Sequence, residues 1–449
     1  MRAHTMRNPF HGCVVSPRES LACGHPWRIG LCREVDVIFL HIFPVIAALL
    51  LAAIAPAVRA ESALPNPGTI SLDALVQEAL EQNPGVRAAE QRFEAAQAAI
   101  SPAQTLPDPT IGVEYTDLET NELMYGVTQE LPFPGKLKLR GEIAGREADQ
   151  VEQEYLAMRL ATVSDLKQAY YELHVAHQSK DIFQRNKALL QEFEESAKAS
   201  YAVGRGAQQD VFRAQTEISR VLTRLAALEQ QQLSLQAEIN RILYRPLGTP
   251  LGVPEPPRMS HLRRSMEGLA AVVDQSAPLL RAQMMGVERA QREVKLAHRE
   301  YYPDFEISAG GVREEPMGDD GYRVMLNVRV PLYYARRQRF EVRGAIASRE
   351  AAFSDLQATK QELLFRIHDN VAQVRRSEEL VALLESALIP QARLTLLSAQ
   401  AGYGVAKVDF LTLLNALLTL QDNELELHME IAAHEQAMAR LEEIIGELP

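Results

Sequence analysis

The chain has 449 residues, which is enough for one large core or for two to three ordinary domains. Its 47 basic and 59 acidic residues give a formal net charge of −12. This balance argues against nucleic-acid binding, since no basic surplus is present to displace the counterions of phosphate groups.

A leader that contains a signal peptide is predicted over residues 1–60. Residues 37–58 are nearly all apolar, and Ala60 closes a small-residue pattern typical of signal-peptidase cleavage. The leader is unusually long, which leaves an extended signal or a later translation start as alternatives. It holds six arginines, three acids and all three cysteines, so the exported chain has a net charge of −15 and no cysteine. A weak lipid-attachment pattern at Cys23 has no apolar run before it, so lipidation is a minor alternative.

The first segment after the leader predicts a helix and then a hairpin. Ser71 is the expected N-cap of a helix that breaks at Asn83-Pro84. Residues 110–116 and 123–130 then alternate between apolar and small or polar side chains. This period is typical of strands, so we predict a β-hairpin over residues 108–131 with one apolar face.

The hairpin leads into a very long helix. Pro132 and Pro134 cannot lie inside a paired strand, so the strand pattern ends there, and Gly135 follows. From about Lys136 the chain runs without proline to the glycines of Gly204-Arg205-Gly206. A second helix follows that turn, and a proline-rich loop ends it.

The same order repeats about 200 residues later. The expected elements are a helix over 266–302, a hairpin over 303–331, a long helix from 338, a turn at Tyr403-Gly404 and a helix over 407–445. Pro331 stands alone where the first hairpin has two prolines, so the two hairpins should bend differently. We predict two structural repeats, residues 61–252 and 253–449.

The helix and strand lengths constrain the assembly. Each long helix would span roughly 100 Å at 1.5 Å per residue, so the chain cannot form a compact globule and is predicted to be mainly α with a small β part. No segment after the leader reaches the roughly 18–20 apolar residues of a transmembrane helix, so a membrane would be crossed by strands. Four strands cannot close a barrel in lipid. Two chains would give a filled barrel, and three would give twelve strands around a passage.

With these features the chain resembles the TolC family of trimeric outer-membrane efflux channels. The resemblance rests on the duplicated order, on Pro107-Asp108 and Pro303-Asp304 before the hairpins, on residues 131–135 and 330–331 after them, and on Tyr201-Ala-Val-Gly204. It implies a homotrimer with a 12-stranded β-barrel in the outer membrane of a Gram-negative cell and an α-helical tunnel in the periplasm. It also implies a periplasmic adaptor (membrane fusion) protein and an inner-membrane RND-type pump as partners.

The segment Gln129-Glu-Leu-Pro-Phe-Pro-Gly-Lys-Leu137 resembles family members that serve heavy-metal exporters. The resemblance therefore implies a passive exit duct for cations such as copper and silver or cobalt, zinc and cadmium. A multidrug or type I secretion duct is the alternative, and a soluble periplasmic coiled-coil adaptor is a weaker one.

The resemblance also suggests site residues. Pro132, Pro134, Gly135 and Pro331 would form the transition from barrel to tunnel, and Gly204, Arg205, Gly206 and Gly404 the helix tips that contact the adaptor. Asp210 and Asp409 follow the two tips, where the family narrows its tunnel, so rings of carboxylates could constrict the pore. The alternative is that each aspartate simply stabilises the first turn of a helix.

No catalytic constellation is expected. The chain contains no nucleophile–histidine–acid pattern, phosphate-binding loop or cysteine–histidine cluster, so we expect neither an enzyme nor a cofactor. His174 and His177 are three residues apart on the long helix, and we interpret them as part of a solvated face rather than as metal ligands.

Overall fold

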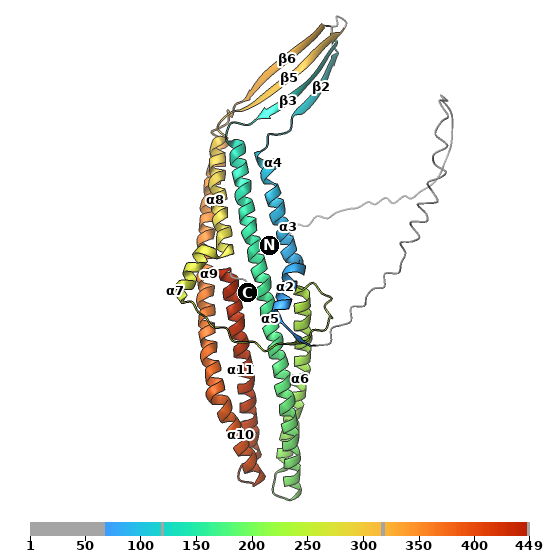
Figure 1. Cartoon of the computed structure of the whole chain (residues 1–449), viewed down its shortest axis with the longest axis vertical. Coiled ribbons are helices and arrows are strands. Elements are labelled where there is room, and N and C mark those ends of the chain that lie inside the picture. The colour runs from blue at the N-terminus through green and yellow to red at the C-terminus, as the bar shows by residue number, and fades with distance from the viewer. Residues whose placement is uncertain (1–67, 118–120, 316–318, 447–449) are drawn as a thin grey trace, which may run out of the picture. The chain divides into compact units, whose positions relative to one another are not determined.

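The computed structural model describes residues 68–117, 121–315 and 319–446 (Figure 1). The leader and its cysteines lie outside these residues, so the signal peptide and the alternative at Cys23 stay predictions. The described chain is mainly helical with one four-stranded sheet, as the sequence predicts.

The first half of the chain follows the predicted order. Its elements are α2 (Leu72–Gln82), α3 (Pro84–Ala98), α4 (Ile100–Gln104), β2 (Thr110–Asp117), β3 (Asn121–Leu131), α5 (Lys136–Ala202) and α6 (Gln208–Ile242). The expected break at Asn83 is present because its side chain accepts hydrogen bonds from the N–H groups of Gly85 and Val86, at 2.7 and 3.2 Å. Asn83 thereby caps α3, which begins at a proline.

The second half repeats this order. Its elements are α7 (Met266–Ser276), α8 (Pro278–Arg299), β5 (Asp304–Glu315), β6 (Asp319–Arg329), α9 (Gln338–Leu383), the π-helical turn η1 (Leu384–Leu388), α10 (Ile389–Gly404) and α11 (Phe410–Ile445). The two long helical stretches, α5 and α9 through α10, both span 67 residues. The π-turn was not predicted; it lets the helix continue past Pro390, which has no N–H to donate.

One part of this second stretch qualifies the prediction about transmembrane helices. Within Gln338–Gly404 there is a window long and apolar enough to cross a membrane by length and composition alone. Its C-terminal part, α10, packs against α11 through the buried side chains of Ala392, Leu396 and Ala399. The window is 22% buried in the single chain, and α10 of the same stretch packs on α11, so one such window is weak evidence for a membrane span.

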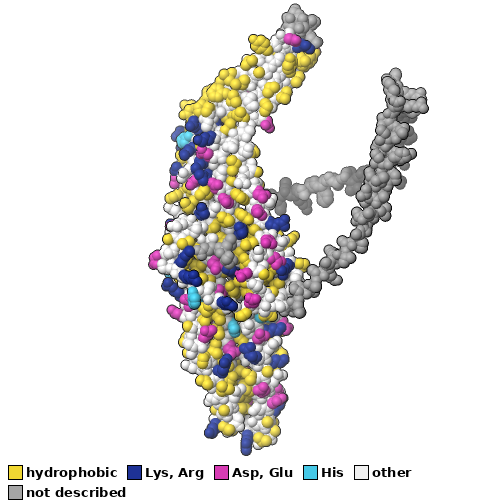
Figure 2. Space-filling view, viewed as in Figure 1, with side chains coloured by type: hydrophobic (Ala, Val, Ile, Leu, Met, Phe, Trp, Pro, Cys, Tyr) yellow, Lys and Arg dark blue, Asp and Glu magenta, His cyan; other side chains and the backbone are white. Residues whose placement is uncertain are grey.

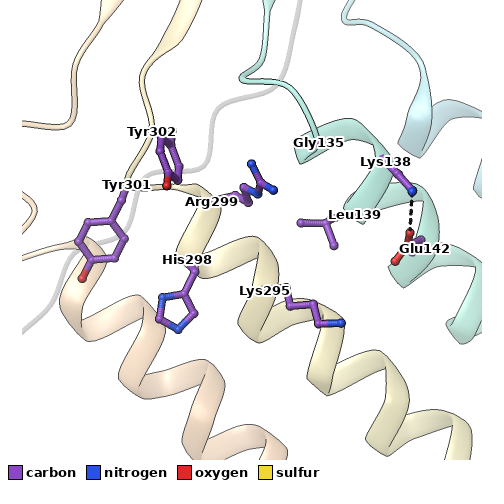
Figure 3. Close-up of a pocket in the computed structure, with 9 residues that line it drawn as sticks. All are labelled: Gly135, Lys138, Leu139, Glu142, Lys295, His298, Arg299, Tyr301 and Tyr302. Carbon is purple, nitrogen blue, oxygen red and sulfur yellow. Dashed lines mark ion pairs between the residues drawn. The ribbon is translucent and has the colours of Figure 1, made fainter.

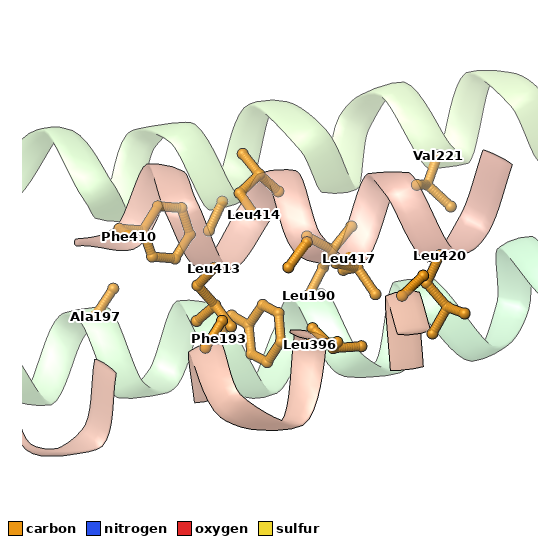
Figure 4. Close-up of a cluster of buried hydrophobic side chains, with 14 of the residues drawn as sticks. Leu190, Phe193, Ala197, Val221, Leu396, Phe410, Leu413, Leu414, Leu417 and Leu420 are labelled. Carbon is orange, nitrogen blue, oxygen red and sulfur yellow. The ribbon is translucent and has the colours of Figure 1, made fainter. Parts of the chain in front are cut away.

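Helix α5 is the centre of the helical bundle. It packs against α6, α8 and α11 and also against α3 and α4 (Figure 1). At the end of the bundle that is farthest from the sheet, α5, α6, α10 and α11 share a core of leucine and aromatic side chains around Phe193, Phe410 and Leu413 (Figure 4).

A short parallel pair of strands, formed by segments far apart in the sequence, was not predicted. β1 (Thr69–Ile70) pairs with β4 (Val253–Pro254), which lies in the predicted proline-rich loop after α6. A Cβ on Gly252 would lie 1.8 Å from the carbonyl oxygen of Gly68, so this close approach requires glycine.

The main sheet is antiparallel in the order β2-β3-β5-β6. Its register aligns apolar residues on one face, including Ile111, Val127, Ala309 and Val324 in one row. The next row on the opposite face contains Thr110, Thr128, Ser308 and Met325. The large apolar side chains of the first face are exposed in the single chain, as expected for strands that face lipid.

Candidate functional site

The first junction from strand to helix lies between β3 and α5. Pro132 and Pro134 belong to neither element. Gly135 has a φ of 92°, a left-handed conformation that glycine adopts without a Cβ penalty, and immediately precedes α5. The chain therefore changes from strand to helix over Pro132–Gly135.

Lys136 ties this junction to the second half of the chain. Its side chain is 1% exposed, and its Nζ donates hydrogen bonds to both carboxylate oxygens of Asp304, at 2.9 and 3.0 Å, and to Glu300 Oε2 at 2.9 Å. The carbonyl of Tyr302 lies 3.3 Å away as a further acceptor. A buried ammonium group requires such charged and polar acceptors to offset its desolvation.

Asp304 also binds the backbone of the same junction. The N–H of Phe133 donates to Asp304 Oδ1 at 2.8 Å. The ring of Phe133 stacks on Tyr302 with ring centroids 4.5 Å apart. The sequence marks both the proline–glycine segment and Pro303-Asp304, but their pairing across more than 160 residues is a tertiary contact that no local pattern reveals.

The second junction, from β6 to α9, is longer. α5 begins four residues after Pro132, whereas α9 begins seven residues after Pro331. The additional residues form a turn in which the N–H groups of Arg336 and Arg337 both donate to the carbonyl of Tyr333 at 2.9 Å. The two junctions therefore bend differently, as the single proline suggests.

Gln338 occupies the place in α9 that Lys136 has in α5. It is the first residue of its helix and is 7% exposed. Its Oε1 is buried and has no hydrogen-bond partner among the described residues. Among the described residues, the second junction therefore has no counterpart of the Lys136 contacts; its ion pair is the local one between Arg337 and Glu341, at 3.0 Å.

The backbones of the two helix tips have the same conformation, and equivalent residues are 202 positions apart in the sequence. In the first tip, Arg205 N donates to the carbonyl of Ser200 at 2.9 Å, and Gly204 has a φ of 72°. In the second, Lys407 N donates to the carbonyl of Gly402 at 2.9 Å, and Ala406 has a φ of 56°.

This alignment changes the role of one expected glycine. Gly404 is the last residue of α10 and has a helical conformation, while Ala406 takes the left-handed position that Gly204 has in the first tip. The sequence did not indicate Ala406, because alanine is rare in this conformation. Gly204, Arg205 and Gly206 all lie in the first helix tip, which connects α5 to α6.

The two aspartates are not in equivalent positions. Asp409 is the N-cap of α11, and its carboxylate accepts a hydrogen bond from the N–H of Thr412 at 3.0 Å. Hydrogen bonds from the side chain and backbone of Thr412 lower the pKa of Asp409. Asp210 lies in the first turn of α6, whose N-cap is Ala207. Asp409 thus caps a helix and Asp210 lies in a first turn, so both can stabilise their helices, while their role in a constriction stays a prediction.

His174 is buried, so the interpretation of its helix face as solvated was wrong. It is 3% exposed, and its ring lies 6.2 Å from the ring of His428 on α11. Burial, the largest cause, and the neighbouring His428 lower the pKa of His174. No group of three or more metal-ligating side chains is found in the part of the chain that the structure describes.

Comparison with known proteins identifies the family. The model of the outer membrane efflux protein family matches residues 75–243 and 271–447. The chain is 21% identical to the cobalt-zinc-cadmium resistance protein CzcC of Cupriavidus metallidurans, over 84% of this chain and 90% of CzcC. It is 22% identical to the outer membrane protein TolC of Vibrio cholerae, over 68% and 72% of the two chains.

The fold agrees with these similarities. The structure superimposes on a solved structure of CusC with a TM-score of 0.75 at 16% identity, covering 84% of this chain and 92% of that one. Members of this family are channels and not enzymes. The chain therefore belongs to the outer membrane efflux protein family and is a TolC-type channel of the Gram-negative outer membrane that reaches into the periplasm.

Proposed function

We propose that this chain is the exit duct of a tripartite system that exports heavy-metal cations. The observation that carries the proposal is the similarity to CzcC over 84% of the chain, since that relative is named for cobalt, zinc and cadmium resistance. The segment around Pro132–Lys136, which resembles metal-exporting members, points to the same cargo.

The sheet supports a homotrimer in which three chains close a 12-stranded barrel. β2 and β6 are the edge strands of the described sheet, and an open edge is not tolerated in lipid. In each further chain the β6 edge would pair with the β2 edge of the next. The apolar rows would then face lipid and the polar rows would line the passage.

The helices support the same assembly. α5 is covered by its own preceding helices, α3 and α4, and by α8 of the second repeat. α9 packs on α8 and α11. Whereas α5 is also covered by α8 of the second repeat, the chain has no third repeat to cover α9 in the same way, and Phe340, Ile346 and Phe353 are exposed along it. The α3–α4 region of the next chain would fill this place.

The tips would serve the adaptor and the pore. Gly204, Arg205 and Gly206 in one tip and Gly404 beside the other would contact a periplasmic adaptor protein, which would connect the channel to an inner-membrane RND-type pump. Asp210 and Asp409 would contribute rings of carboxylates to a constriction. In the same assignment, Pro132, Pro134, Gly135 and Pro331 are the transition from barrel to tunnel. Residues 61–252 and 253–449 are the two repeats after the leader.

The cargo is tested by deleting the gene and measuring growth with copper, silver, zinc, cobalt and cadmium salts beside dyes and detergents. We expect increased sensitivity to metals that a plasmid copy reverses. Unchanged metal tolerance with increased dye sensitivity would instead identify a multidrug duct, and loss of a secreted protein a type I secretion duct. A soluble coiled-coil adaptor would purify as a monodisperse species without detergent, whereas the channel requires detergent.

A further inference from the structure

A cationic pocket lies where the sheet meets the helices. It is a cavity of 760 Å³ between the start of α5 and the end of α8. Lys138, Lys295, His298 and Arg299 line it together with Tyr301 and Tyr302 (Figure 3). We refer to these six residues as the junction pocket; its wall also contains Gly135, Leu139 and one acid, Glu142, so four basic side chains face a single carboxylate.

The basic groups of the junction pocket are poorly neutralised. Lys138 makes only a 3.9 Å contact with Glu142, which also lies 3.5 Å from Arg292. Across the described ranges 68–117, 121–315 and 319–446, no carboxylate lies within 4.0 Å of Lys295, His298 or Arg299. In a chain of net charge −12, such a local excess of positive charge favours an anionic ligand.

The pocket is placed at the boundary between lipid and water. Gly135 and Tyr302 in its wall are close to the ends of the strands, since β3 ends at Leu131 and β5 begins at Asp304. Leu131 aligns with Phe305 and Val328 in the apolar row nearest the pocket. Figure 2 shows lysine and arginine side chains gathered directly below the apolar surface of the sheet.

The neighbouring junction adds interfacial side chains. Leu332, Tyr333 and Tyr334 follow β6 and are exposed. Tyrosines concentrate at the level of lipid headgroups, where one end of the ring is apolar and the hydroxyl is wet. These side chains place the junction pocket at headgroup depth in the membrane.

We propose that the junction pocket binds the phosphate of an anionic phospholipid in the periplasmic leaflet of the outer membrane. Lys295 and Arg299 hold the phosphate, Tyr301 and Tyr302 flank the headgroup, and the acyl chains lie along the apolar rows of the strands. The proposal rests on the outer-membrane location and is independent of the cargo.

The test is native mass spectrometry of the detergent-purified full-length protein with phosphatidylglycerol, and with phosphatidylcholine of the same acyl chains. We expect one tightly retained phosphatidylglycerol per chain and weaker retention of phosphatidylcholine. The double substitution Lys295→Glu/Arg299→Glu should weaken phosphatidylglycerol retention by about 30-fold or more, because each basic group near an anionic headgroup contributes about 1 kcal/mol. If charge reversal impairs assembly, the neutral double substitution Lys295→Gln/Arg299→Gln is used instead, and it should also weaken the retention of phosphatidylglycerol.

The matched control is Lys187→Glu/Arg224→Glu, which makes the same charge change on α5 and α6 away from the sheet. Retention equal in the control and in Lys295→Glu/Arg299→Glu would overturn the proposal, as would equal retention of the two lipids by the native protein. Inorganic phosphate at millimolar concentration should not displace the lipid. Displacement would identify a free anion as the ligand and overturn the assignment to lipid.

Discussion

Lys136 and Asp304 join the two halves of the chain at the point where the strands become helices. The ammonium group of Lys136 is buried and lies 2.9 and 3.0 Å from the two carboxylate oxygens of Asp304. One residue begins α5 and the other begins β5, so this single contact fixes the exit of one hairpin against the start of the next.

Removal of this cation should destabilise the junction. Lys136→Met keeps most of the side-chain volume but leaves Asp304 and Glu300 with Arg140, 3.8 Å from Glu300, as their remaining counter-charge. We expect a loss of about 2–3 kcal/mol, below the range for fully buried pairs because both carboxylates are about one-third exposed. The measurement is the thermal unfolding midpoint in detergent. Lys198→Met, at an exposed position on the same helix and outside the junction pocket, is the control and should leave the midpoint nearly unchanged.

A related contact is expected between chains. Asp108 lies two residues before β2 and follows Pro107 as Asp304, the first residue of β5, follows Pro303; Gln338 begins α9 as Lys136 begins α5. In the proposed trimer Asp108 of one chain meets Gln338 of the next. Gln338→Lys should then create the missing ion pair and raise the temperature at which the trimer dissociates in SDS. The gain should vanish in Gln338→Lys/Asp108→Asn; a gain that persists in the double variant would refute this contact.

The periodicity of the sequence predicts most of the fold. Alternation over 110–131 and 304–330 becomes four strands, and the proline-free run after Lys136 becomes α5. These features depend on local spacing, which a sequence displays directly. The turn η1 was missed because the pattern around Pro390 remains helical, and the helix is repaired by a local change in hydrogen bonding.

The candidate sites are harder to predict because their contacts are distant or depend on backbone conformation. Lys136 lies in the segment 129–137 that the sequence singles out. Its acceptors, Glu300 and Asp304, are more than 160 residues away in the sequence and come close only in the folded chain. Ala406 has the conformation that sequence reasoning assigns to glycine, so Gly404 was placed at the turn instead.

The left-handed conformation of Ala406 makes the second tip less stable than it would be with a glycine at this position. Its φ of 56° costs an alanine about 1–2 kcal/mol relative to its right-handed conformation, and glycine has no such penalty. Ala406→Gly should therefore slow amide hydrogen exchange in the second tip. Gly204→Ala should accelerate exchange in the first tip, since its φ is 72°. Gly404→Ala is the control: it is helical with open space around it, so exchange should not accelerate.

His174 should make stability depend on pH. Burial, the largest cause, and the charge of His428 lower its pKa below 6.5, so the folded state binds fewer protons than the unfolded state when the pH falls below that value. The two neighbouring histidines also have charged groups around them. Asp181 raises and Lys180 lowers the pKa of His177. Glu424 raises and Arg185 lowers the pKa of His428. The stabilising contribution of neutral His174 is therefore present above pH 6.5 and lost below it.

We expect the thermal midpoint of the native protein to fall between pH 7 and pH 5, and His174→Gln to reduce this slope. His261→Gln, at an exposed position, is the control and should retain the native slope. An unchanged slope in His174→Gln would assign the pH dependence to other groups.

Asp409 combines a structural role with a proposed pore role, and two substitutions separate them. Asp409→Asn keeps an acceptor for the N–H of Thr412 and removes only the charge, while Asp409→Ala removes both. If three carboxylates line a constriction, both variants should raise single-channel conductance in planar bilayers and weaken block by hexaamminecobalt(III). Only Asp409→Ala should also lower the thermal midpoint, because it removes the N-cap acceptor of α11. Native conductance and block in Asp409→Asn would show that Asp409 acts as a helix cap alone.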